Sequence, residues 1–143
     1  MRIKLFQLRR RLRKDQRGQA IVELALILPV FLLMVLGMID LARAWNAKQV
    51  ITDAAREAAR RGVVDNPIVT QTYVEGVAES ALSNAGFDYN LATITATGVN
   101  APTGDPLQVD ITYPYTFEFM SIFMNMIGGN TVTLTTSIVM RNE

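Results

Sequence analysis

The sequence predicts an α+β fold, in which a long N-terminal helix and a short second helix pack on a three-stranded antiparallel sheet. Two observations support this fold class. Apolar residues follow a helical period over roughly the first sixty positions, and from about residue 91 apolar and polar residues alternate with a period of two. A helix and an antiparallel sheet that bury their apolar faces against each other form a stable two-layer arrangement.

Charge is distributed very unevenly along the 143 residues, although the net charge is only +1. Residues 1–17 hold eight lysines and arginines against one aspartate, a net charge of +7, and the remaining residues carry −6. A basic arm of this kind is typical of contact with nucleic acid or with an anionic membrane. Because an apolar run follows directly, we expect the cytoplasmic flank of a membrane span and no nucleic-acid partner.

The apolar run is long enough to cross a bilayer. Residues 24–39 contain no charge, and 21 residues counted from Gln19 span about 32 Å as a helix, which matches a hydrocarbon core of about 30 Å. We therefore expect residues 19–40 to form a transmembrane segment, with residues 1–18 in the cytoplasm and 41–143 outside. Pro29 should kink this helix or free one of its carbonyl groups.

A secretory signal peptide is the alternative explanation of the same N-terminal region. Ala42-Arg43-Ala44 fits a signal peptidase site, and cleavage there would release a domain that begins at Trp45. The apolar run is longer than the 7–15 residues usual for a signal core, and the helical pattern continues through Ala44. The membrane-anchored alternative is therefore favoured.

The segment after the span predicts a continuation of the same helix, so that residues 20–61 form one helix that stops at Gly62. Its expected buried stripe consists of Leu41, Ala44, Trp45, Lys48, Ile51, Ala55, Ala58 and Ala59. The alanines of residues 54–59 are expected to pack on the sheet. The alternative is close approach between helices of different subunits, which small residues permit.

The rest of the chain predicts a second helix and three strands. Asn66 and Pro67 fit an N-cap and a first helical residue, and Gly86 should end that helix. The apolar face expected for it consists of Val69, Tyr73, Val77 and Ala81. The period of two then predicts strands over 91–99, 107–113 and 132–138. Pro114 indicates a sheet edge or a bulge.

Residue types that usually carry catalysis or bind metals are scarce. The sequence has no histidine and no cysteine, which removes the commonest general base and the usual zinc ligands. The acids of the C-terminal half are scattered, and Gly128-Gly129 is a turn rather than a nucleotide loop. We expect no enzyme activity, no cofactor and no metal.

One acid stands near the start of the apolar run, in the stretch RGQAIVELALILP of residues 17–29, and Glu23 is the fifth residue after Gly18. A carboxylate in hydrocarbon is costly and is usually kept for function. A basic leader ending in Gly, then an apolar helix with this Glu, is similar to type IV-like prepilins. Residues 17–62 resemble the TadE-like pseudopilins of the tight-adherence (Flp pilus) machinery, and residues 107–141 resemble them more loosely.

The resemblance implies a pilin-like fold and a processing step. A prepilin peptidase would cleave between Gly18 and Gln19 and remove the leader 1–18. The product would be a minor pilin or pseudopilin for pilus assembly, a single-pass protein of the bacterial inner membrane that can enter the pilus. Its partners would be other pilin subunits, the inner-membrane assembly platform and membrane lipid. A minor pseudopilin of a type II secretion system shares the same leader and remains an alternative.

The same resemblance offers a role for Glu23. Cleavage would create an α-amino group at Gln19, about one helical turn from Glu23, and in a bundle Glu23 could pair with that amine on an adjacent subunit. Such pairing would compensate two buried charges and set the axial register. The alternative is that Glu23 reaches the membrane surface in a monomer.

Residues 121–127 are unusually apolar for a connection between strands. They are expected either to form a small helix folded over the sheet or to present a subunit-contact patch. The candidate contact residues are Phe123, Met124 and Met126.

Overall fold

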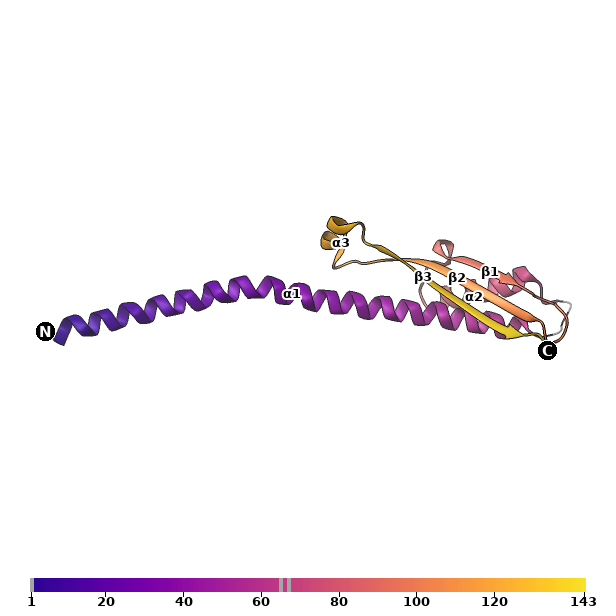
Figure 1. Ribbon diagram of the computed structural model, residues 1–143, viewed down its shortest axis with the longest axis horizontal. Helices are drawn as coiled ribbons and strands as arrows, with labels where there is room; N and C mark the ends of the chain where they lie inside the picture. The colour runs from indigo at the N-terminus through magenta and orange to yellow at the C-terminus, as the bar shows by residue number, and fades with distance from the viewer. Residues whose placement is uncertain (1, 65, 67) are drawn as a thin grey trace. The chain divides into compact units, whose positions relative to one another are not determined.

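The structure is a computed structural model that describes residues 2–64, 66 and 68–143, with side chains given from residue 18 onward except for residues 122, 123 and 127. The elements along the chain are α1 (Arg2–Gly62), α2 (Gln71–Asn84), η1 (Tyr89–Leu91), β1 (Thr93–Thr97), β2 (Pro106–Thr116), α3 (Ser121–Ile127) and β3 (Thr131–Arg141) (Figure 1). The predicted α+β fold class is confirmed.

The chain divides into two compact units, one that ends at Ile39 and one that comprises Asp40–Glu143. The first unit is the N-terminal part of α1, and from residue 18 onward most of its large apolar side chains are exposed. This part of α1 belongs to the one helix of the described residues that is long and apolar enough to cross a membrane. The helix continues through Pro29 without a break. This anchor-like segment fits a single-pass membrane protein.

The second unit is built on a three-stranded antiparallel sheet of order β1-β2-β3. The register between β2 and β3 runs unbroken from Pro106 opposite Arg141 to Thr116 opposite Thr131. β1 pairs with β2 only as far as Thr112. Pro114 therefore lies where β2 has a neighbour on one side only, so the edge position predicted for it is confirmed and a bulge is excluded.

The core of this unit lies between the C-terminal half of α1, α2 and one face of the sheet. The alanine face predicted to pack on the sheet does so, because Ala54, Ala55, Ala58 and Ala59 are at most 2% exposed. These small side chains let α1 approach closely. The large core residues opposite them are Val74, Leu82, Leu107, Val109 and Ile111.

Two further features join α1 to the rest of the unit. Lys48 donates a hydrogen bond from its ammonium group to the carbonyl oxygen of Thr135 on β3. Gly62 is buried, and a Cβ there would lie 2.8 Å from the Leu107 Cδ1 atom. The helix ends at Gly62 as predicted, and a side chain there would require the ends of the Leu107 and Val74 side chains to shift.

The stripe predicted for α1 is wrong at its first turn. Leu41 and Trp45 are 68% and 69% exposed, and the buried positions nearby are Asp40 and Ala47. Burial therefore follows the face that points to the sheet, and two of the largest apolar side chains after the apolar run are left outside the core.

The start of α2 also differs from the prediction. The helix begins at Gln71, and the Thr70 hydroxyl caps it by accepting a hydrogen bond from the Tyr73 N–H at 3.2 Å. Asn66 instead accepts a hydrogen bond from the N–H of Ile68 at 3.0 Å, which forms a local turn. Pro67 lies outside the described residues.

The buried face of α2 is rotated by about one residue from the predicted face. Its buried residues are Val74, Ala78 and Leu82, whereas Tyr73 is exposed and Val77 and Ala81 are half-buried. This orientation buries the large side chain of Leu82 and leaves Tyr73 42% exposed.

Strand β1 is shorter at both ends than the predicted segment 91–99. Leu91 belongs to η1, and the backbone turns at Gly98 with φ of +79°. A Cβ at Gly98 would lie 2.2 Å from the Pro106 carbonyl oxygen. Only glycine fits this turn between β1 and β2.

Candidate assembly site

The predicted processing site lies on α1, and both Gly18 and Gln19 are exposed. A Cβ at Gly18 would meet no atom within 4 Å, and its φ is not positive. Neither packing nor backbone conformation therefore requires glycine at this position. Glycine in a helix costs about 1 kcal/mol relative to alanine, so the fold gains nothing from it.

Glu23 lies one helical turn beyond Gln19, about 6 Å along the axis. It is exposed on α1 and is flanked by Val22 and Leu24, which are also exposed. Among the side chains described from residue 18 onward, Glu23 forms no ion pair. A carboxylate on an apolar helix surface is costly in hydrocarbon unless a positive group compensates it.

Asp40 is a buried carboxylate that the sequence analysis did not single out. Its side chain is fully buried, and its Oδ2 atom accepts hydrogen bonds from the N–H groups of Phe119 at 2.9 Å and Met120 at 2.7 Å. Its Oδ1 atom has no hydrogen-bond partner among the described residues. Asp40 thus fastens the residues that precede α3 to the first residue of the second unit.

Arg43 lies on the next turn of α1 and supports the same junction. Its guanidinium group pairs with the Glu118 carboxylate and lies 5.7 Å from the centre of the Phe119 ring. The hydrogen bond to Glu118 raises the pKa of Arg43 above its ordinary value. The charges of Arg43 and Glu118 therefore offset each other beside α3.

The candidate contact residues of the 121–127 segment lie on α3. This segment forms a helix, which lies beyond the last residue of β2 at one end of the sheet (Figure 1). Met126 is 81% exposed and Met124 is half-buried. The side chain of Phe123 lies outside the described residues. Exposed apolar side chains on such a helix suit contact with another apolar surface.

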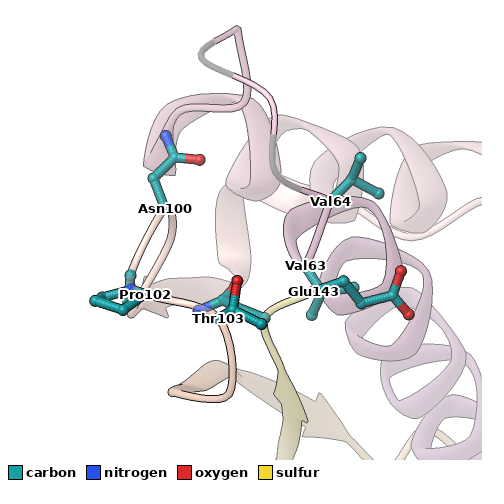
Figure 2. A pocket seen from close by; sticks show the side chains of 8 residues that line it. Val63, Val64, Asn100, Pro102, Thr103 and Glu143 are labelled. Atoms are coloured by element: carbon teal, nitrogen blue, oxygen red, sulfur yellow. The ribbon is translucent and has the colours of Figure 1, made fainter.

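A pocket of about 300 Å³ lies at the opposite end of the second unit. Figure 2 shows Asn100, Pro102 and Thr103 on one side of it and Val63 and Val64 on the other. Glu143 is the one ionisable residue in its described lining. A single carboxylate beside apolar and amide groups does not provide the paired groups of acid–base catalysis.

Comparison with known protein families bears on the N-terminal half of the chain, where the predicted processing site, Glu23, Asp40 and the alanine face all lie. Residues 18–60 match the family model described as TadE-like protein. This segment is TadE-like. No match was found among curated proteins or among solved structures.

The match confirms the resemblance drawn from the sequence and covers the main part of it. The TadE-like description agrees with the family that the sequence resembles, and the match covers 43 of the 143 residues. It begins at Gly18, includes Glu23 and Asp40, and ends two residues before the end of α1. The strands lie outside it.

Asp40 could have been found from its position in the sequence. It is the first charged residue after the sixteen uncharged residues 24–39, and an acid there faces either water or a specific partner. Its partners could not be predicted, because they are backbone N–H groups almost eighty residues later in the chain. A pattern of side chains does not reveal such partners.

Proposed function

We propose that this chain is a minor pilin or pseudopilin that assembles a tight-adherence (Flp-type) type IV pilus, and that it is not an enzyme. A prepilin peptidase cleaves it after Gly18 on the cytoplasmic side. The mature chain begins at Gln19 and is anchored in the bacterial inner membrane by α1, with the second unit outside. The TadE-like match over residues 18–60 carries this proposal.

The surroundings of Gly18 support the cleavage step. Glycine weakens a helix, and no neighbouring atom of the described chain occupies the space that a side chain would fill. The fold therefore gives no reason for glycine at this position. A peptidase that binds the backbone closely would give one, because glycine has no side chain to block its approach.

Glu23 supports assembly with other pilin subunits. After cleavage, the new amino group of Gln19 carries a positive charge about one turn from an exposed carboxylate on an apolar helix. When helices of several subunits pack together, each carboxylate compensates the amino group of a neighbour. An unpaired charge in that setting is strongly unfavourable, so correctly aligned helices are preferred.

Release of a soluble domain after Ala44 has less support. Cleavage there would remove Asp40 and Arg43, whose contacts hold the residues before α3. It would also cut α1 three residues before the buried Ala47. The type II secretion alternative shares the leader, and the tight-adherence association of the TadE-like segment favours the pilus.

The test is the N-terminus and intact mass of the protein from cells with and without the prepilin peptidase. We expect a start at Gln19 only when the peptidase is present, and an uncleaved chain for Gly18→Val. Gly76→Val is the matched control, because Gly76 is also a helical glycine with an open Cβ position; it should be processed normally. A start at Trp45, or an uncleaved Met1 in both strains, would contradict the proposal.

A further inference from the structure

The residues just before α3 are held next to residue 40 of α1. Asp40 directly follows the sixteen uncharged residues of the apolar segment, and its Oδ2 atom holds the N–H groups of Phe119 and Met120, the two residues before α3. Within the second unit, α3 lies at the end where α1 enters, and the chain's C-terminus lies at the other end (Figure 1). The start of α3 is therefore held at Asp40, the residue that directly follows the uncharged apolar segment.

The surface around this junction is apolar and carries little net charge. Phe119 and Met126 are 46% and 81% exposed, and Leu41 and Trp45 on the neighbouring turns of α1 are also exposed. Residues 119–140 contain no charged residue. Asp40 is buried under this surface, and the two charged side chains exposed beside it, Arg43 and Glu118, are paired with each other, so they do not strongly oppose contact with an apolar phase.

We propose that α3 lies in the interfacial region of the lipid bilayer from which α1 emerges, with Phe119, Met126, Leu41 and Trp45 in contact with lipid. This inference rests on the proposed function, because it needs α1 to span the membrane. Tryptophan is enriched at the boundary between headgroups and acyl chains, and Trp45 lies about 9 Å along the helix beyond Ile39. The side chains of residues 122, 123 and 127 are not needed for the inference.

The anchor makes this weak contact effective. A seven-residue helix buries too little apolar area to hold a soluble protein on a membrane, but α1 already keeps α3 at the bilayer surface. A tethered contact forms at high effective concentration. A stable interface with a second copy buries about 1,000 Å² or more, which demands more surface than these few side chains provide, so lipid is the better-matched partner.

The contact would give the second unit a preferred orientation at the membrane. Asp40 fixes α3 relative to the first turn of the unit, so lipid contact by Met126 restricts how far the unit can tilt. When a subunit leaves the bilayer for a filament, the same side chains lose their lipid and become available to a neighbour.

The test uses the full-length protein in phosphatidylcholine vesicles that contain nitroxide-labelled lipid. The sequence has no cysteine and a single tryptophan, so Met126→Cys accepts one fluorescent label and Trp45 is an internal probe. Val139→Cys is the matched control, because Val139 is an exposed apolar residue eight positions along β3 from its start at Thr131. That separation is about 26 Å.

We expect nitroxide lipid to quench both Trp45 and the label at position 126, the latter several-fold more strongly than the label at position 139. Quenching of Trp45 without quenching at position 126 would overturn the inference and leave the anchor intact. No quenching at either position, with the protein still floating with the vesicles, would overturn the inference and leave the anchor intact, whereas loss of vesicle flotation would overturn the anchor itself. Shielding of the label at position 126 only at high protein density, together with 126–126 disulfide formation by the unlabelled Met126→Cys protein, would replace lipid with a second copy.

Discussion

The two halves of α1 differ in the size of their apolar residues, and the difference matches their surroundings. From residue 18 to residue 39 the apolar residues are mostly leucine, isoleucine and valine, and most of their side chains are exposed. After residue 47 the buried residues are mostly alanine. Large exposed side chains need an apolar phase from outside the chain, whereas small ones allow the backbone to approach a sheet. Hydrophobicity alone therefore does not say what a helix packs against.

The largest expected effect tests the exposed half of α1. It concerns Glu23, the one acid between Gly18 and Ile39. Glu23→Gln keeps the side-chain size and removes the charge that we propose compensates the Gln19 amine of a neighbour. We expect subunit crosslinking in the membrane to fall on the order of a hundredfold, because an uncompensated buried charge costs about 3 kcal/mol or more.

The matched control for this change is Glu79→Gln, which alters an exposed acid of α2 and should leave crosslinking unchanged. Processing at Gly18 should be the same in both variants, as measured by intact mass. Crosslinking of Glu23→Gln at the level of the unaltered protein would mean that the exposed half of α1 assembles without a charge partner.

A smaller effect is expected from enlarging the alanine face. Ala58→Leu places a large side chain where none is accommodated, because Ala58 is fully buried, and it should lower the free energy of unfolding of the second unit by about 3 kcal/mol. Ala42→Leu adds the same atoms at an exposed position of the same helix and should change it by less than about 0.5 kcal/mol. Urea unfolding in detergent measures both, and equal losses would refute the distinction between the two faces.

The smallest expected effect is local and concerns the junction between the two halves. Asp40→Ala removes the acceptor of two backbone hydrogen bonds. We expect the free energy of local opening at Phe119 and Met120 to fall by about 2 kcal/mol, or about thirtyfold in amide-exchange protection. Amides of β2 near Val109 should be unaffected, and Asp53→Ala, at an exposed position, should change neither region. Unchanged protection at Phe119 and Met120 would show that Asp40 does not hold α3.

The class of each major element could be predicted from the sequence, because periodicity reports burial directly. The alanine face, the end of α1 at Gly62 and the three strands follow from periods of 3.6 and 2. The ion pair of Glu57 with Arg61, at 2.7 Å, also follows from residues four apart on a helix.

The predictions that the structure contradicts concern positions where two or more residues could serve the same structural role. Asn66 and Thr70 are both good N-caps, and the choice of Thr70 depends on which α2 face meets the sheet. Leu41 and Trp45 have the right helical spacing, but the sheet lies against a neighbouring face. The requirement for glycine at position 98 depends on how closely Pro106 approaches, and local sequence does not contain that distance.

The candidate site divides in the same way. The family resemblance could mark Gly18, Gln19 and Glu23, because their spacing is local and lies on one helix. The role of Asp40 could not be predicted, because it depends on two backbone N–H groups that become its neighbours only when the chain folds.

The unbroken course of α1 through the bond between Gly18 and Gln19 has a kinetic consequence. The carbonyl of Gly18 is an acceptor within the helix, four residues before the N–H that bonds to it, and a peptidase that needs an extended strand must first unwind this turn. Glycine lowers the cost of unwinding by about 1 kcal/mol relative to alanine. Unwound backbone is tolerated only where water or protein can satisfy its polar groups. For the proposed cleavage after Gly18, a bond that lies deeper in the membrane would therefore open less often and be cut more slowly.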